Sequence, residues 1–284
     1  MLETAQSGLL HAALVARDTP LQQAPNGVRY ASFGEITLPS ADLDRMVQAV
    51  PRTIAAALTG SAYYFVPLAL GERPSLAPPD LASTGARDPN QQTLIASQYS
   101  TDFSDQAVCH RNVRLGTGSA SFDGVFISTR LLGDRFALAF EFFINVGHAF
   151  VDTAGVPERF ATLAWSQALA DVRGETSQDA WESRNLALAG TRKEAILEPK
   201  PEGVLGPKSQ VDEKARLSFV EAAFSDAVAI YQLSLAVDFD YAELREREYP
   251  LLAPQALAER LRLIASLFPP NPGYEFAIRY RRRP

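Results

Sequence analysis

Hydrophobic and polar residues follow two kinds of spacing along this chain, strand-like alternation in the first half and helix-like spacing in most of the second. In the first half, short apolar runs bounded by turn residues predict strands over 28–38, 63–70, 92–99 and 107–115. Ser40 is placed to cap a helix over 41–58, and Pro51 should kink or divide that helix.

The central apolar segment, 126–146, fits two different structures. The pair Gly133-Asp134 lies between two alternating apolar runs, which is typical of a β-hairpin. Registered on that turn, the two strands place most of their bulky apolar side chains on one face, namely Leu131, Ile127, Val125, Phe136, Leu138, Phe140 and Phe142. This consistent register favours the hairpin. As a single helix over 136–152, the same sequence aligns four polar residues along one stripe, namely Glu141, Asn145, His148 and Asp152.

The second half is predicted to be helical until its last few residues. Capping residues and apolar spacing predict helices from Asp152 or Thr153 to 172, from 176 or 177 to about 197, over 211–233 and over 254–268, with a short helix starting at Asp240. The alternation in 274–281 predicts a final strand that returns to the N-terminal sheet. Two Pro-rich connections, 71–91 and 198–207, separate elements, and the sequence does not decide whether the first is a lid or merely mobile.

These elements predict an α+β fold with a largely antiparallel sheet, built from the N-terminal half plus the C-terminal strand. A helical layer from about 152 to 268 covers it. The length of 284 residues is near the size at which one hydrophobic core begins to split. We therefore expect one domain, 1–284, with an alternative of two lobes. In that alternative, 1–151 plus 273–284 are strand-rich and 152–272 are helical.

Composition narrows the class of protein. Hydrophobic residues make up 46% and charged residues 21%, as in globular proteins. The charge-free run 53–71 has about the length of a membrane span, but Gly60-Ser61 and Pro67 interrupt it, so a helix end, a turn and a buried strand are expected instead. The chain shows no signal or transit peptide pattern, and we expect a cytoplasmic protein that does not enter a membrane.

Charge and cysteine content exclude further classes. The net charge of −6 argues against nucleic acid as a partner, with only a short basic tail, 279–283, pointing the other way. The single cysteine, Cys109, excludes an intramolecular disulfide and a cysteine-based zinc cluster. Its strand position, shared with Val113 and Leu115, predicts a thiol that faces the core.

Candidate chemistry rests on few polar groups. Of the three histidines, His11 is expected to be an ordinary packed or surface residue, whereas His110 and His148 are candidate acid–base groups. Glu141 is a candidate general base, because burial among phenylalanines would raise its pKa; the simpler alternative is that it faces solvent or pairs with Arg130. If a metal is bound, the helical alternative for 136–152 supplies His148, Glu141 and Asp152 as ligands.

Two functional classes remain open. The favoured one is a small-molecule-binding protein, or an acid–base or metal-assisted enzyme, with aromatic strands that line a pocket. The alternative is a non-catalytic assembly or protein-interaction protein, for which the alternating terminal segment offers a strand edge, and in which oligomers are expected. The sequence does not indicate a cofactor, a substrate or a partner.

Overall fold

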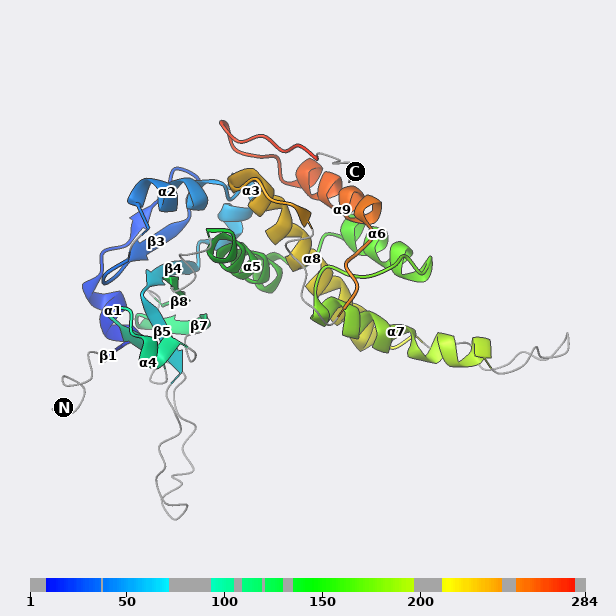
Figure 1. Cartoon of the computed structure of the whole chain (residues 1–284), viewed down its shortest axis with the longest axis horizontal. Helices are drawn as coiled ribbons and strands as arrows, with labels where there is room; N and C mark the ends of the chain where they lie inside the picture. The colour runs from blue at the N-terminus through cyan, green and yellow to red at the C-terminus, as the bar shows by residue number, and fades with distance from the viewer. Residues whose placement is uncertain are drawn as a thin grey trace, which may run out of the picture. The chain divides into compact units, whose positions relative to one another are not determined.

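The computed structural model describes residues 9–36, 38–71, 93–104, 109–118, 121–129, 135–196, 211–241 and 249–278. The fold is α+β, as predicted, with the described strands in the first half of the chain and the long helices in the second (Figure 1). The chain divides into two compact units. The sheet unit comprises Met1–Asn145 and Pro270–Tyr274, and the helical unit comprises Val146–Pro269 and Glu275–Pro284.

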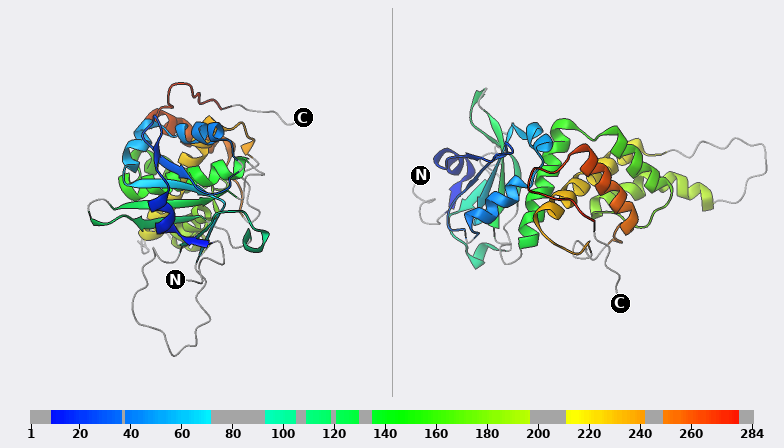
Figure 2. Two further views of the ribbon diagram at one scale, coloured as in Figure 1. Left: turned by 90° about the vertical axis from the view of Figure 1, so that its left-hand side faces the viewer. Right: turned by 90° about the horizontal axis from the view of Figure 1, so that it is seen from above.

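Two sheets form the centre of the sheet unit, as the two views in Figure 2 show. One is antiparallel with the strand order β1 (Leu9–His11), β6 (Thr93–Ala96), β5 (Leu68–Gly71). The other is mixed, with the order β2 (Gln22–Gln23), β3 (Arg29–Ser32), β4 (Ser61–Val66), β8 (Phe122–Ser128), β7 (His110–Leu115). Its central strands β3, β4 and β8 are parallel, and its two edge strands are antiparallel to their neighbours. Antiparallel pairing therefore dominates, but not at the centre of the larger sheet.

Helices cover both faces of the mixed sheet. Tyr30 and Tyr63 are paired in β3 and β4 and so share one face, where the Tyr30 hydroxyl donates to Asp44 of α2 (Ser40–Gln48). Phe142 of α5 (Arg135–Ala154) packs edge-on against Tyr63 on the same face. The opposite face carries Tyr64, which belongs to a buried apolar cluster that includes Ala12 and Val15 of α1 (Ala12–Asp18).

Two prolines set boundaries in the sheet unit. Pro51 divides the helix predicted over 41–58, because α2 ends at Gln48 and a short helix, α3 (Arg52–Ala55), begins after Pro51 and continues as the 3-10 turn η1 (Ala56–Leu58). Pro67 separates β4 from β5, so the chain passes at this residue from the mixed sheet to the antiparallel one. The charge-free run 53–71 is thus a helix end and a turn, as predicted, followed by two strands in place of the single strand expected.

The hairpin predicted around Gly133-Asp134 is wrong. Its first strand exists as β8, but the residues expected to form the second strand lie in α5, a helix of 20 residues. The turn residues 130–134 lie outside the described residues. The buried side chains of α5 follow helical spacing, namely Leu138, Ala139, Phe142, Phe143, Val146 and Phe150. Almost every residue from 136 to 144 is apolar, so the same letters also satisfied an alternating pattern.

The helical unit is organised around α8 (Glu213–Ala236), whose N-cap Asp212 accepts a hydrogen bond from the amide of Ala215. The surrounding helices are the C-terminal part of α5, α6 (Glu158–Leu169), α7 (Gln178–Ile196) and α9 (Pro254–Leu267). Phe224 of α8 packs against Phe150, Phe160 and Phe268. Among the described residues, α8 alone is long and apolar enough to cross a membrane, and 78% of that apolar stretch is buried inside the protein, as in the core helix of a globular unit.

Helix boundaries in the helical unit agree with the sequence in three places and differ in one. α7, α8 and α9 occupy the predicted segments, and Ser177 accepts a hydrogen bond from the amide of Ala180 at 3.2 Å, as a capping residue does. The helix expected from 152 or 153 to 172 is instead the end of α5, a break at Gly155, and α6. The segments 72–91, 198–207 and 242–248, with their predicted connections and short helix, lie outside the described residues.

The predicted C-terminal strand is not formed over 274–278, where the backbone has no regular structure. The burial of these residues alternates as the sequence suggested, but side chains anchor them in place of a strand ladder. The Tyr274 hydroxyl donates to the carbonyl of Arg45 at 2.6 Å, and the Phe276 ring packs edge-on against Tyr231. The strand edge that motivated an interaction role is therefore missing from these described residues.

Candidate functional site

The thiol of Cys109 forms a polar cluster with two residues of α5. It donates to the carboxylate of Glu141, and the amide of Asn145 also hydrogen-bonds to the sulfur. The Asn145 amide donates in addition to the Glu141 carbonyl at 2.7 Å and to its carboxylate at 3.2 Å. These three residues lie in the sheet unit, and together with Tyr63 they are called the thiol cluster below.

The thiol in this cluster is kept protonated. Burial raises the pKa of Cys109, and the Glu141 carboxylate raises it further by repelling the thiolate and by accepting the S–H hydrogen bond. Asn145 and the nearby Arg111 oppose this effect. A thiol whose pKa is raised is a poor nucleophile. The thiol faces the interior, as predicted, and keeps some exposure. The predicted face is wrong, because the register of β7 shifts between His110 and Val113, so Cys109 lies on the Tyr63 side of the sheet while Val113 and Leu115 pack with Tyr64 on the other side.

Tyr63 completes the cluster from the side of β4. Its side chain is fully buried, and its hydroxyl has no hydrogen-bond partner among the described residues. Burial raises the pKa of Tyr63, and the neighbouring Cys109 contributes to the same shift. A buried hydroxyl without a partner is uncommon in native structures and needs an explanation.

His110, a predicted acid–base group, is not part of this cluster. Its Nδ1 atom lies 3.2 Å from the hydroxyl of Thr93 in β6, and its Nε2 atom is buried without a partner among the described residues. Burial lowers the pKa of His110, so the ring is neutral near pH 7. This neutral ring lies beside Gly71 of β5. A Cβ added at Gly71 would lie 3.6 Å from the Cε1 atom of His110.

The predicted metal ligands do not come together. Glu141, His148 and Asp152 all lie on α5, but they are spread over twelve residues, and Asp152 is exposed. No group of three or more histidine, cysteine, aspartate or glutamate side chains with metal-binding geometry occurs in the part of the chain that the structure describes. The helical alternative for 136–152 is thus correct as a backbone, while Glu141 contacts Cys109 and Asn145.

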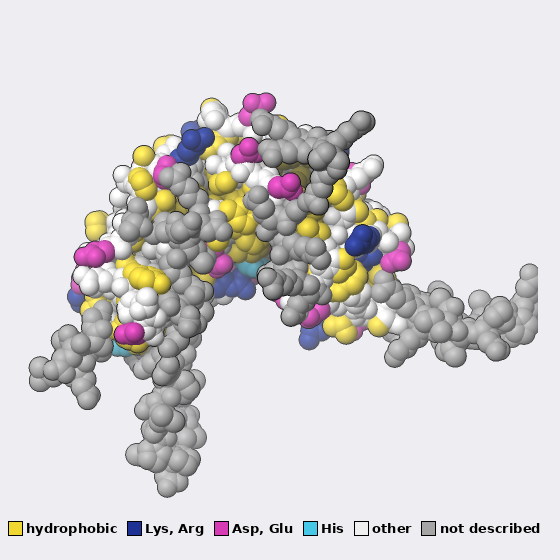
Figure 3. Space-filling model, in the orientation of Figure 1, with side chains coloured by type: hydrophobic (Ala, Val, Ile, Leu, Met, Phe, Trp, Pro, Cys, Tyr) yellow, Lys and Arg dark blue, Asp and Glu magenta, His cyan; other side chains and the backbone are white. Residues whose placement is uncertain are grey.

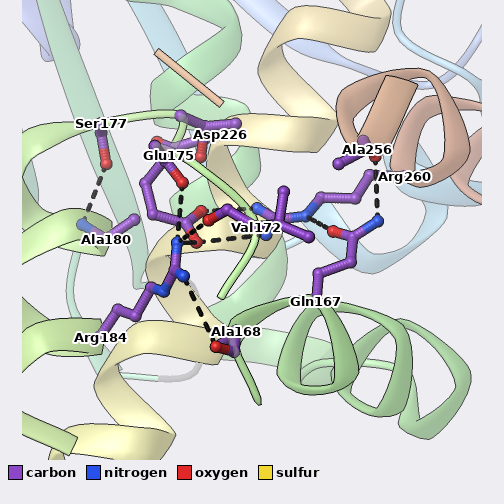
Figure 4. A network of polar contacts seen from close by, with 12 residues as sticks. Gln167, Ala168, Val172, Glu175, Ser177, Ala180, Arg184, Asp226, Ala256 and Arg260 are labelled. Carbon is purple, nitrogen blue, oxygen red and sulfur yellow. Dashed lines mark hydrogen bonds and ion pairs between the residues drawn. The ribbon is translucent and has the colours of Figure 1, made fainter. Parts of the chain in front are cut away.

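A second polar cluster, which the sequence did not indicate, is buried in the helical unit (Figure 4). Glu175 is fully buried and accepts from Arg260 at 2.9 Å and from Arg184 at 3.3 Å, and both arginines are also buried. Arg184 donates in addition to the carbonyls of Val172 and Gly174. Gln167 accepts from the Arg260 Nε atom at 2.8 Å. We call this group the ion network.

Asp226 of α8 borders the ion network. It is buried and accepts a hydrogen bond from the Thr176 hydroxyl at 2.8 Å and one from Ser177. Burial raises the pKa of Asp226 to about 6, against the opposing effects of these two hydroxyls and of Arg260. In the same segment, the backbone of Gly174 lies very close to that of Leu251, because a Cβ at Gly174 would be 2.0 Å from the carbonyl oxygen of Leu251.

Surface features give no better candidate. A shallow depression of about 440 Å³ is lined by Glu158, Arg159, Thr162, Leu163 and Leu263, and none of these described residues has a buried polar side-chain atom without a partner. On the face drawn in Figure 3, the described acidic and basic side chains are scattered and form no single large patch.

Some residues of both clusters could have been predicted from the sequence. Arg184 falls among Ala180, Ala187 and Leu188 on the buried stripe of α7, and Arg260 falls between Leu257 and Ile264 on that of α9. A cation on an apolar stripe signals a buried partner, but not which one.

A scan of protein-family models found no match to this chain, and a search of curated proteins found none either. The function is therefore inferred from the residues described above.

Proposed function

We propose that the protein binds a small molecule that carries an amine or amide N–H, and that the thiol cluster is its site. The observation that supports this proposal most directly is the Tyr63 hydroxyl, which is fully buried beside Cys109 and has no partner among the described residues. Leaving such a group unsatisfied costs about 1–3 kcal/mol. A bound ligand that accepts from this hydroxyl or donates to it would recover that free energy.

The chemistry of the cluster favours an N–H donor as the ligand group. Glu141 supplies a carboxylate that is only half-buried, and the next residue of α5, Phe142, packs edge-on against Tyr63. Arg111 balances part of the negative charge, so a neutral amide fits as well as an amine.

The same cluster supports binding and not nucleophilic catalysis. The raised pKa of Cys109 keeps the thiol uncharged at neutral pH, where a nucleophilic cysteine needs to be a thiolate. Asn145 is held by Glu141 and is not oriented toward a histidine. In this proposal Cys109 and Asn145 fix the position of the Glu141 carboxylate, and Glu141 and Tyr63 contact the ligand.

Benzylamine and benzyl alcohol are suitable probes, because they differ only in the donor group. We expect the full chain to bind benzylamine more tightly than benzyl alcohol by ligand-observed NMR titration. Tyr63→Phe should weaken both probes, and Glu141→Gln should abolish the preference for the amine. Each lost hydrogen bond to a charged group corresponds to roughly tenfold or more in affinity.

Tyr64→Phe is the matched control. Tyr64 also has a buried hydroxyl without a partner among the described residues, but it lies on the opposite face of the mixed sheet, stacked on Phe126. Its replacement should leave both probes unaffected. Equal binding of benzylamine by wild type, Tyr63→Phe and Glu141→Gln, or no binding at millimolar concentration, would count against the proposed site.

A further inference from the structure

We propose that Asp226 is a proton-binding switch that stabilises the helical unit when the pH falls. This inference is independent of the proposed ligand site, because Asp226 and all its contacts lie in the helical unit. It rests on the geometry of the ion network and its surroundings.

The charged and polar groups that surround Asp226 come from several elements of the helical unit and are almost completely buried. The segment 175–177 supplies Glu175, Thr176 and Ser177, α9 supplies Arg260, and Tyr241 follows α8. From α5, Gly147 packs against the backbone of the neighbouring Ser225, and His148 follows it in sequence. Arg260 is shared, because it pairs with both oxygens of Glu175 at 2.9 and 3.4 Å. Asp226 therefore obtains only part of the compensation that its own negative charge requires.

Burial of the carboxylate decides the direction of the switch, because the nearby charges oppose that direction. Two buried arginines face one buried carboxylate, Glu175, which both of them contact. Asp226 has two hydroxyl donors but forms no direct ion pair within the described residues of the helical unit. The burial of Asp226 outweighs its two hydroxyl donors and the attraction of Arg260, so it favours the protonated carboxyl and raises the pKa of Asp226 to about 6.

The sign of the effect follows from proton linkage. The pKa of Asp226 is higher in the folded protein than the ordinary value of 3.8, so the folded state binds more protons between those two values. The stabilisation is complete below pH 3.8 and is lost as the pH rises through about 6. Between pH 7.5 and pH 5 the equilibrium constant for folding should rise about tenfold through this group alone.

Both tryptophans of the chain, Trp165 and Trp181, lie in the helical unit, so tryptophan fluorescence follows the unfolding of that unit in the full chain. Trp165 packs on Phe219 of α8. We would measure urea unfolding at pH 7.5 and pH 5 for wild type and Asp226→Asn. His148 is present in both, so its titration cancels in the comparison.

The expected result is that the equilibrium constant for folding of wild type gains about tenfold on acidification relative to Asp226→Asn. Identical pH dependence in the two proteins would overturn the proposal. If Asp226→Asn does not fold, Thr176→Val serves instead. Loss of the donor to Asp226 should move the transition in stability to higher pH, and an unchanged transition would equally overturn the proposal.

Discussion

Asn145 lies one helical turn after Glu141 and donates to both the carbonyl and the carboxylate of that residue, at 2.7 and 3.2 Å. One side chain thus satisfies the backbone of α5 and fixes the carboxylate that holds the Cys109 thiol. Glu141 and Asn145, the first two residues of the polar stripe of α5, therefore make their contacts within the sheet unit.

The reactivity of Cys109 should increase when Glu141 is neutralised. Glu141→Gln keeps the shape of the side chain but removes the charge that repels the thiolate, so the pKa of Cys109 should fall. The rate of labelling by an aromatic disulfide at pH 8 should rise by roughly threefold for each unit by which the pKa falls, because the larger thiolate fraction is partly offset by lower nucleophilicity. Cys109→Ser measures the background, because the chain has no other cysteine. Equal or slower labelling of Glu141→Gln would show that Glu141 does not control the thiol.

The close approach of α5 to α8 should not tolerate a side chain at Gly147. A Cβ there would lie 2.6 Å from the carbonyl oxygen of Ser225. Alanine gains about 1 kcal/mol in helix propensity, but overpacking of this kind costs roughly 1–3 kcal/mol, so we expect a net loss of stability. Gly60→Ala is the control, since nothing lies within 4 Å of a Cβ at that position. Urea unfolding of both variants tests this, and a more stable Gly147→Ala protein would contradict the helix contact.

Loss of one arginine from the ion network should destabilise the helical unit strongly. Arg260→Met leaves the buried Glu175 with Arg184 as its remaining ion-pair partner, and removal of one partner from a buried pair costs about 3–5 kcal/mol. Tryptophan fluorescence during urea unfolding measures the loss. Arg17→Ala, which removes an exposed ion pair with Asp18, should leave the curve unchanged.

A triple replacement separates the ion network from simple packing. Glu175→Leu, Arg184→Met and Arg260→Met together remove every charge of the ion network and leave the bordering Asp226 with its two hydroxyl donors. Such a protein should recover most of the stability that Arg260→Met alone loses. A triple variant as unstable as the sum of its single variants would mean that the ion pairs themselves stabilise the unit.

Acid should weaken the region around His110. The pKa of His110 is lowered in the folded protein by burial, so its contribution to stability is present above the ordinary value of 6.5 and is lost as the pH falls through the lower folded value. His110→Asn can keep the contact with Thr93 through an atom in the position of Nδ1, but it does not titrate. Thermal unfolding followed by circular dichroism should show a smaller loss between pH 7.5 and pH 5.5 for this variant than for wild type. An equal loss in both proteins would exclude His110 as the cause.

The sequence predicted the fold class and most boundaries because those depend on local signals. Pro51 and the capping residue Ser177 act within a few residues of their own positions, and each has the predicted effect. Pro67 divides the single strand predicted over 63–70 into two strands, which the sequence did not indicate. The hairpin failed because residues 136–144 are nearly all apolar, and a uniformly apolar segment carries no period that separates strand from helix. The predicted terminal strand is not formed over 274–278, because alternating burial requires only packing partners for the buried side chains. It does not require backbone hydrogen bonds to a neighbouring strand.

The candidate sites were harder to predict, because they depend on contacts between distant segments. The sequence singles out Glu141 as a candidate base, with solvent exposure or pairing with Arg130 as the simpler alternative, and it assigns the partner Cys109 only to packing. Glu175 precedes the capping residues of α7 and shows no pattern of its own, yet it pairs with Arg260, which follows it by 85 residues. Such pairs become visible only when helices far apart in sequence are packed together.

Pro67 affects how the sheet unit unfolds locally. Val66 and Leu68 belong to different sheets, and the amide of Ala69 donates to the Ser128 hydroxyl of β8 at 2.9 Å. The two sheets are thus joined by one continuous stretch of chain and by a hydrogen bond two residues beyond the junction. Amide protons of β4 and β5 should therefore exchange with solvent in a single cooperative event, as one folding unit and not as two.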